Sequence, residues 1–416
     1  MTADQPSRLA RRLGLADAVV IGLGSMIGAG VFAAIGPAAG AAGSGLLIGL
    51  AVAAVVAYAN ATSSAQLAAV YPEAGGTYVY GRRMLGPFWG FLAGWGFVVG
   101  KTASLAAMAL TAGAYALPEH SRLIGIGAVA VMTAVNVAGI RKTAAVTRVI
   151  VAVVLLALAA VVAGSLSGTE ASIDNLADPT RGGVGGILEA AGLLFFAFAG
   201  YARIATLGEE VLDPVHTIPR AIPLALGIAL AVYAAVAVSA LVAVGPDALA
   251  AAEAPLAAAV VGQPVLVGVV RVGGAVAALG VLLALLAGVS RTGFAMARNG
   301  ELPRWLGAVH PVTRTPYRAE LAVGLVVTVV AAVADLRGAI GFSSFAVLAY
   351  YAIANVSAWA QPPRQRRWPR AFQIVGVVGC IVLALSLPVT SVIGGSMVIA
   401  LGAAIWMVRN RARVQA

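Results

Sequence analysis

Residues 24–30 read Gly-Ser-Met-Ile-Gly-Ala-Gly and interrupt an apolar run that extends from Ala16 to about Ala39. Glycines at this density weaken a helix, because glycine loses the most conformational freedom when it becomes ordered. Inside a bilayer, no water satisfies the N–H and C=O groups that a helix break releases. Such a break is tolerated where the helix ends line a cavity that holds a solute. The first span therefore indicates a transport protein.

The composition requires solvation by lipid. Of the 416 residues, 61% are hydrophobic and only 10% are charged, and the mean hydropathy is +0.96. A soluble protein cannot bury so much apolar surface. Apolar runs of about 18 or more residues predict membrane helices at 16–39, 45–70, 88–117, 123–140, 146–164, 185–207, 218–244, 265–296, 316–333, 340–359, 372–387 and 389–407.

The net charge of +11 follows the predicted topology. With the N-terminus in the cytoplasm, most basic side chains fall on the cytoplasmic side, and only Arg122, Arg181 and Arg337 fall on the other side. This asymmetry is typical of multi-pass membrane proteins. It predicts a cell-membrane protein with both termini in the cytoplasm and a basic surface attracted to anionic lipid. A nucleic-acid partner is not expected.

The residues that carry most enzyme chemistry are scarce. The chain has one cysteine, Cys380, and three histidines, and no predicted span has Asp or Glu near its centre. An intramembrane hydrolase or metalloenzyme needs such groups facing one another inside the bilayer. We therefore expect no metal site, no cofactor and no enzymatic activity.

A second interruption lies in the sixth predicted span. Residues 194–203 read Leu-Phe-Phe-Ala-Phe-Ala-Gly-Tyr-Ala-Arg, which places Gly200 and Arg203 in an otherwise apolar helix. Either interruption alone is also consistent with a glycine that packs against a neighbouring helix. Interruptions in spans one and six, five spans apart, favour an inverted repeat of five plus five helices.

Four segments resemble the amino acid–polyamine–organocation (APC) superfamily. They are the first-span motif at 21–32, the loop motif Tyr-Pro-Glu-Ala-Gly-Gly-Thr-Tyr at 71–78, the Glu-Glu-Val ending of span six at 209–211, and the loop at 290–319. The chain resembles in particular the branch that includes cationic amino acid transporters and their bacterial relatives. The resemblance implies an all-α integral membrane protein with the leucine-transporter fold, broken helices 1 and 6, and two further C-terminal helices. The implied parts are a tail at 1–15, repeats at 16–164 and 185–360, helices at 371–408 and a tail at 409–416.

The broken helices suit an amino acid zwitterion. Its carboxylate fits the free N–H groups and positive dipole end at the second half of span one. Its ammonium fits unwound carbonyls in both spans, as the resemblance also implies. Aromatic side chains of span six are expected to wall or gate the pocket, although packing between helices accounts for them as well. The predicted substrate-binding residues are Ser25, Met26, Ile27, Gly28, Ala29, Gly30, Phe196, Phe198, Ala199, Gly200, Tyr201 and Arg203.

One departure from the family pattern bears on the substrate. Where many relatives carry an acidic residue after the span-six glycine, this chain has Ala202, followed by Arg203. A cationic side chain would have no buried carboxylate to pair with, which costs several kcal/mol in a desolvated pocket. Neutral amino acids are therefore favoured over cationic amino acids and polyamines. Anionic substrates stay open, because Arg203 either meets a second carboxylate or is solvated.

Relatives of this fold bind sodium through side-chain hydroxyls of span eight or replace the ion by a lysine in span five, as the resemblance implies. This sequence has neither arrangement. Residues 280–288 in span eight offer no side-chain oxygen, and residues 150–155 in span five contain no lysine. Lys101, one of two lysines against 25 arginines, lies halfway along span three. Buried lysine releases its proton readily, whereas arginine does not. We therefore predict proton coupling or exchange with Lys101 as the coupling residue, unless it only snorkels or caps carbonyls. Glu209 and Glu210 are then the next candidates.

These features predict a secondary active transporter of amino acids that works by alternating access. The alternatives are a non-coupled facilitator or substrate-sensing relative of the same fold, and a transporter of cationic amino acids or polyamines. The expected partners are a small-molecule amino acid, membrane lipid and protons.

Overall fold

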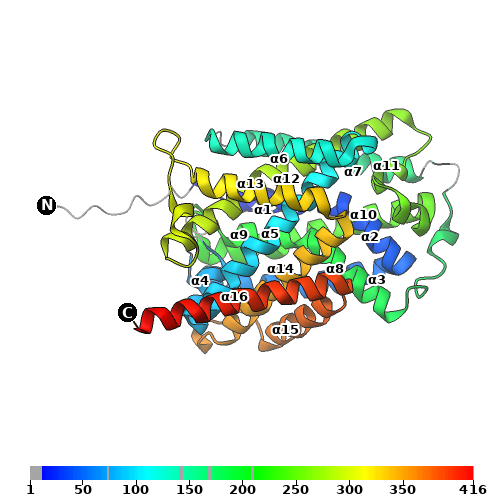
Figure 1. Cartoon of the computed structure of the whole chain (residues 1–416). Coiled ribbons are helices and arrows are strands. Elements are labelled where there is room, and N and C mark those ends of the chain that lie inside the picture. Colours follow the sequence, from blue (N-terminus) through cyan, green and yellow to red (C-terminus); the bar gives the residue numbers. More distant parts are fainter. Residues whose placement is uncertain are drawn as a thin grey trace.

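A computed structural model describes residues 12–72, 75–139, 144–166, 168, 171–207 and 210–415. Within these ranges the chain is helical, apart from connecting segments and one isolated bridge between Leu13 and Val211 (Figure 1). The helices are α1 (Leu15–Met26), α2 (Ala29–Ala42), α3 (Leu46–Val70), α4 (Thr77–Leu85), α5 (Pro87–Ala116), α6 (Ser121–Val137), α7 (Ala144–Leu166), α8 (Gly183–Phe198), α9 (Ala202–Ala205), α10 (Pro214–Ala251), α11 (Pro255–Ala258), α12 (Pro264–Arg298), α13 (Tyr317–Val333), α14 (Leu336–Trp359), α15 (Arg370–Leu385) and α16 (Val389–Gln415). Short 3₁₀ turns connect several of them: η1 (Gly43–Gly45), η2 (Pro118–His120), η3 (Ile173–Leu176), η4 (Ala199–Tyr201), η5 (Arg304–Gly307) and η6 (Pro363–Gln365).

The helices confirm a multi-pass membrane fold. In the described ranges, nine helical segments are long and apolar enough to cross a membrane. One of these, Gly30–Val70, contains the second half of predicted span one and the whole of span two, and the predicted spans nine and eleven correspond to the shorter helices α13 and α15, of 17 and 16 residues. Each predicted span therefore coincides with a helix or a helix pair. Span one divides into α1 and α2, and span six into α8, η4 and α9.

Helix α4 was not predicted from the sequence. Residues 71–78 were expected to form a loop, but Thr77 and Tyr78 begin this nine-residue helix. Gly76 precedes this helix at φ 55°, a backbone conformation that glycine adopts without strain. The Thr77 N–H donates to the Tyr350 hydroxyl of α14 at 3.0 Å. Tertiary contacts thus stabilise a helix that is too short and too polar for an apolar-run analysis to detect.

Helices α5 and α14 form the centre of the bundle. In each, 78% of the most apolar window is buried inside the protein, against 22% for the segment that contains α6 and 17% for α16. Helix α5 packs against α6, α12 and α14, and α16 lies along the outside (Figure 1). Gly100 of α5 permits one close approach, since a Cβ there would lie 2.7 Å from the Cβ of Ala346 in α14. Small residues at such crossings are typical of membrane helix packing.

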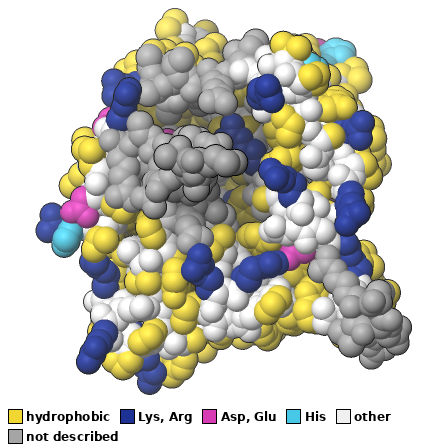
Figure 2. All heavy atoms as spheres, turned by 90° about the vertical axis from the view of Figure 1, so that its left-hand side faces the viewer, with side chains coloured by type: hydrophobic (Ala, Val, Ile, Leu, Met, Phe, Trp, Pro, Cys, Tyr) yellow, Lys and Arg dark blue, Asp and Glu magenta, His cyan; other side chains and the backbone are white. Residues whose placement is uncertain are grey.

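Both described ends of the chain lie at the same end of the bundle (Figure 1). There α1, α5 and α13 begin, and α12 and α16 end. We call this the basic end, because lysine and arginine side chains are spread over this face (Figure 2). Basic residues near helix ends here include Arg12, Arg82, Arg298, Arg318, Arg370 and Arg409.

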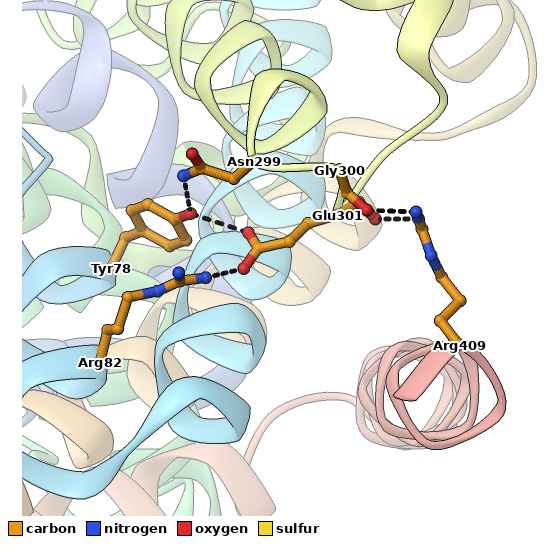
Figure 3. A network of polar contacts seen from close by, with 6 residues as sticks. All are labelled: Tyr78, Arg82, Asn299, Gly300, Glu301 and Arg409. Atoms are coloured by element: carbon orange, nitrogen blue, oxygen red, sulfur yellow. Dashed lines mark hydrogen bonds and ion pairs between the residues drawn. The ribbon is translucent and has the colours of Figure 1, made fainter. Parts of the chain in front are cut away.

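A polar network joins α4 to the loop after α12 at the basic end (Figure 3). The Glu301 side chain is only 8% exposed and pairs with Arg82 of α4. The Tyr78 hydroxyl donates to the second Glu301 oxygen at 2.8 Å and accepts from the Asn299 amide at 2.7 Å. A buried carboxylate with a charged partner and a hydroxyl donor is well satisfied, so this network fixes the loop on the helix bundle.

The same loop anchors the last helix. The Arg409 guanidinium of α16 donates to the backbone carbonyl of Glu301 at 2.6 Å and to that of Gly300 (Figure 3). A cation near the C-terminus of α12 also complements the helix dipole. Helix α16 is therefore attached to the bundle at the basic end by charge as well as by packing.

Candidate functional site

The break in span one is sharp. Helix α1 ends at Met26, Ile27 has ψ 14°, and Gly28 has ψ −141°, outside the helical range. The Ile27 N–H still donates to the Leu23 carbonyl at 2.7 Å. Helix α2 then begins at Ala29 with Gly28 as its N-cap, and no side chain accepts from its first N–H groups. The break thus presents the positive end of α2, which favours an anion.

The interruption in span six is milder than the sequence analysis predicts. From Ala199 to Ala202 the backbone stays near the right-handed helical region, and the chain tightens into the 3₁₀ turn η4 instead of unwinding. Helix α9 follows for only four residues and ends before Thr206. The 3₁₀ turn therefore changes the direction of the carbonyl groups in this segment, but the helix does not unwind.

The two interruptions lie against each other. A Cβ on Gly200 would lie well under 3.0 Å from the backbone carbonyl of Ser25. A Cβ on Gly30 would lie 2.6 Å from the Cα of Ala197. Only glycine allows this backbone approach. The structure therefore brings residues 25–30 and 197–200 together, although some 170 residues separate them in the sequence.

A tyrosine that sequence reasoning missed links both interruptions. The buried Tyr233 hydroxyl of α10 lies 2.5 Å from the Met26 carbonyl and 3.0 Å from the Ala197 carbonyl. The Tyr351 hydroxyl of α14 donates to the Ala199 carbonyl at 3.1 Å. A hydroxyl has one proton to donate, so Tyr233 satisfies one carbonyl at a time and leaves the other as an acceptor. The only signal in the sequence is a tyrosine within an apolar span.

The predicted aromatic residues are held by the same two tyrosines. Phe198 is fully buried and packs edge to face on Tyr233, with ring centroids 5.1 Å apart. Tyr201 is fully buried and stacks on Tyr351 at 5.1 Å. Phe196 is only partly buried. The rings of Phe198 and Tyr201 thus belong to the packed core beside the crossing.

A small cavity lies beside the span-one break, with a volume of about 10 Å³. This volume suits about one water molecule and is far too small for an amino acid. All its side chains are aliphatic, so any oxygen atom facing it belongs to the backbone. It is lined by Leu23, Gly24, Ile27 and Gly28 of the break, Ile150, Val151 and Val154 of α7, and Ala277, Gly280 and Val281 of α12.

The two predicted charged residues lie outside this cavity lining. Lys101 is 9% exposed in the middle of α5, and no hydrogen bond or ion pair to its side chain occurs in the described parts of the chain. Arg203 lies on α9, beyond the crossing towards the basic end, and its side chain is exposed. Its guanidinium donates to the Thr206 hydroxyl at 3.4 Å.

The remaining predicted residues have different positions. The Ser25 hydroxyl donates to the Ile21 carbonyl of its own helix at 3.0 Å, so it does not face the crossing as a free donor. The Glu210 carbonyl accepts from the backbone N–H groups of Arg12 and Leu13, which attaches the segment after α9 to the segment before α1. The Ala29 side chain and Glu209 lie outside the described part of the chain.

The chain is similar to known transport proteins over nearly its whole length. The family model described as amino acid permease matches residues 13–409. An uncharacterized transporter of Mycobacterium tuberculosis is 62% identical over 415 residues, covering 98% of this chain and 93% of the relative. The branched-chain amino acid permease BcaP of Bacillus subtilis is 26% identical, covering 97% and 94%. The chloroplastic cationic amino acid transporter 7 of Arabidopsis thaliana is 28% identical, covering 84% and 65%.

We predict that Gly200→Ala destabilises the protein, because the new methyl group overlaps the Ser25 carbonyl. Overpacking of this kind typically costs about 1–3 kcal/mol. Thermal unfolding in detergent measures the effect, with Gly227→Ala as the control, since no atom lies within 4 Å of a Cβ there. Equal unfolding temperatures for the two variants would show that the helices at the crossing are not in contact.

We predict that Tyr233→Phe also destabilises the protein, because the Met26 and Ala197 carbonyls lose their shared donor. A buried polar group without a partner costs about 1–3 kcal/mol. Tyr58→Phe is the control, because Tyr58 is partly exposed on α3 and keeps its ring contact with Phe372. If Tyr233→Phe unfolds at the temperature of the Tyr58→Phe control, Tyr233 does not bridge the two interruptions.

Proposed function

Because the chain belongs to the amino acid permease family, within the amino acid–polyamine–organocation superfamily, we propose that it is a secondary active transporter of neutral amino acids. It works by alternating access around the crossing of the two interrupted spans. The repeats at 16–164 and 185–360 move relative to each other in this proposal, and the basic end faces the cytoplasm, as expected from the positive-inside rule.

The crossing carries the proposal, because it offers complementary groups for a zwitterion. The uncapped start of α2 at Gly28 and Ala29 suits a carboxylate. The Met26 and Ala197 carbonyls share one hydroxyl proton, so one of them remains to accept from an ammonium group. Hydrogen bonds to the substrate thus take the place of the intrahelical hydrogen bonds that are missing at the interruptions.

The neighbourhood of the crossing supports a neutral side chain. Ala202 follows the turn η4, and the buried aromatic rings of Phe198 and Tyr201 lie beside it. The name of the Bacillus subtilis relative BcaP gives branched-chain amino acids as its substrates. An anionic substrate would meet Arg203 with its second carboxylate. The Arabidopsis relative is named a cationic amino acid transporter, so cationic amino acids are the alternative class of substrate.

The cavity beside the break supports coupling without sodium. Its side chains provide no oxygen, whereas sodium prefers several oxygen ligands. We propose coupling to protons or exchange, with Lys101 as the titrating or fixed cation at mid-membrane depth. A facilitator without coupling, or a substrate-sensing relative, is the second candidate; it would bind the amino acid without accumulating it.

We predict that purified protein in lipid vesicles takes up radiolabelled L-leucine and that replacing sodium by choline leaves the uptake unchanged. An inward proton gradient or internal unlabelled leucine accelerates it. Competition by L-lysine, L-glutamate and L-isoleucine separates cationic, anionic and neutral selectivity. Absence of uptake for all amino acids contradicts the proposed function, and a steep sodium dependence contradicts coupling without sodium.

For Lys101, we predict that Lys101→Arg and Lys101→Met both lose accumulation driven by a proton gradient but retain exchange. Arginine keeps the charge and cannot release its proton, whereas methionine keeps the bulk without charge. The measurement is leucine accumulation and counterflow in the same vesicles. If only the arginine variant still accumulates leucine, Lys101 acts as a fixed cation. If both variants accumulate leucine normally, Lys101 has no part in coupling.

A further inference from the structure

A long groove lies between helices α6 and α13, which pack side by side (Figure 1). Its volume is about 620 Å³, whereas the cavity at the span-one break has about 10 Å³. Leu321 and Leu325 of α13 line one rim and are 52% and 67% exposed. Ala130 and Ala134 of α6 line the other rim and are exposed as well. The α6–α13 groove therefore opens on the outer surface of the bundle, where lipid surrounds the protein.

The floor of the groove is apolar, although it contains two threonines. The Thr133 hydroxyl donates to the Val129 carbonyl at 2.7 Å, and the Thr328 hydroxyl donates to the Gly324 carbonyl at 2.9 Å. Each hydroxyl proton is thus used within its own helix. A Cβ on Gly324 would lie 2.5 Å from the Thr133 Oγ1 atom, so the two helices touch at the bottom of the groove. Such a closed, apolar floor suits a hydrocarbon chain.

The length of the groove matches one leaflet of a bilayer. Its lining extends over residues 129–138 of the α6 segment and 321–328 of α13. At 1.5 Å per residue these stretches are about 10–14 Å long. The hydrocarbon core of a bilayer is about 30 Å thick, so one leaflet contributes about 15 Å. Because α13 begins at the basic end, the groove extends from that membrane surface towards the middle of the bilayer.

A well-connected loop closes the groove at the basic end. His310 and Thr313 of this loop belong to the groove lining. The backbone N–H of His310 donates to the Thr315 carbonyl at 2.8 Å, and that of Arg314 donates to the His310 carbonyl at 3.1 Å. The Thr315 hydroxyl donates to the Val137 carbonyl at the end of α6 at 3.2 Å. These bonds hold the loop, with Arg314, at the mouth of the groove.

The mouth of the groove is positively charged. Residues 304–318 include three arginines and one histidine but no Asp or Glu. Arg314 and Arg318 are exposed. Arg318 lies three residues before Leu321, which places both on one face of α13. Its Nε atom donates to the Tyr317 hydroxyl at 2.9 Å, and the guanidinium has two further donor groups. The apolar groove thus ends at a cluster of cations.

His310 adds a neutral donor within the groove lining. Its Nδ1 atom accepts from the backbone N–H groups of Val312 and Thr313 at 3.3 and 3.2 Å. The ring proton is therefore on Nε2, on the other side of the ring, where it can be donated to a ligand. Guanidinium and imidazole N–H groups suit the oxygens of a phosphate. A zwitterionic headgroup would bring a further cation to the arginines, so the charge favours an anionic headgroup.

We propose that the α6–α13 groove binds one anionic phospholipid from the leaflet at the basic end. One acyl chain lies in the groove between Leu325 and Ala134, and the phosphate contacts Arg314, Arg318 and His310. Basic groups at this level of the membrane attract anionic lipid. The site is separate from the crossing of the interrupted spans, and it does not depend on the proposed transport function.

The test is native mass spectrometry, which counts the lipids bound to each protein molecule. Delipidated protein in detergent is titrated with dioleoyl phosphatidylglycerol, which is anionic, or with dioleoyl phosphatidylcholine, which is zwitterionic. We expect one phosphatidylglycerol molecule to bind about tenfold or more tighter than phosphatidylcholine, because two arginines favour the anionic lipid.

A first pair of variants tests the headgroup contacts. Arg314→Gln combined with Arg318→Gln should weaken the binding of phosphatidylglycerol by about tenfold or more. The matched control is Arg364→Gln combined with Arg367→Gln, because these arginines are exposed between α14 and α15. The control should bind phosphatidylglycerol like the parent protein.

A second pair of variants tests the position of the acyl chain. Ala134→Trp fills the groove from its rim and should abolish the tightly bound lipid. Val131→Trp is the control, because Val131 is on the same helix, is 56% exposed and lies outside the groove lining. Both positions are on the surface, and the unfolding temperature of each variant verifies that the fold is kept.

The proposal is overturned if the Arg314/Arg318 variant binds phosphatidylglycerol as tightly as its control, or if Ala134→Trp retains the tightly bound lipid. Equal affinity for phosphatidylcholine and phosphatidylglycerol overturns the anionic specificity and with it the proposal. A protein dimer that Ala134→Trp dissociates, without tightly bound lipid in the parent, shows that a second copy of the chain covers the groove instead.

Discussion

The backbone groups released at the break of span one constrain the rest of the structure. In lipid these groups need partners, and one side-chain donor, the Tyr233 hydroxyl, lies at the break. The Tyr233 hydroxyl reaches the Met26 carbonyl from α10, and the turn in span six brings the Ala197 carbonyl to the same hydroxyl. Gly30 and Gly200 permit the approach. The N–H groups at the start of α2 have no side-chain partner, which is why a bound carboxylate fits there.

Paired and unpaired charged side chains lie in different regions of the protein. At the basic end, Arg82 and Arg409 bind Glu301 and its neighbouring carbonyl, and they attach α4 and α16 to the loop after α12. Deeper in the protein, Lys101 and Glu320 are buried without an ion pair in the described structure. Paired charges stabilise one arrangement, whereas an unpaired buried charge changes its protonation at low cost. Lys101 is therefore the residue to which we assign a proton-dependent role.

Much of the fold was predictable from the sequence, because apolar runs long enough to cross a bilayer are rare outside membrane proteins. The glycines at 28, 30 and 200 also located the crossing. Three features were not accessible. Helix α4 is short and polar, the span-six break is only a 3₁₀ turn, and Tyr233 and Glu320 are single polar residues whose importance depends on neighbours distant in sequence. Only tertiary structure shows which backbone groups Tyr233 faces and that Glu320 is buried.

The most direct test of the central claim is an electron cryo-microscopy structure of the protein with L-leucine bound. The account predicts density for the amino acid at the crossing, with its carboxylate on the N–H groups of Gly28 to Gly30 and its ammonium on the Met26 or Ala197 carbonyl. Leucine density elsewhere, with the two interruptions still in the contact described above, would contradict the proposed site.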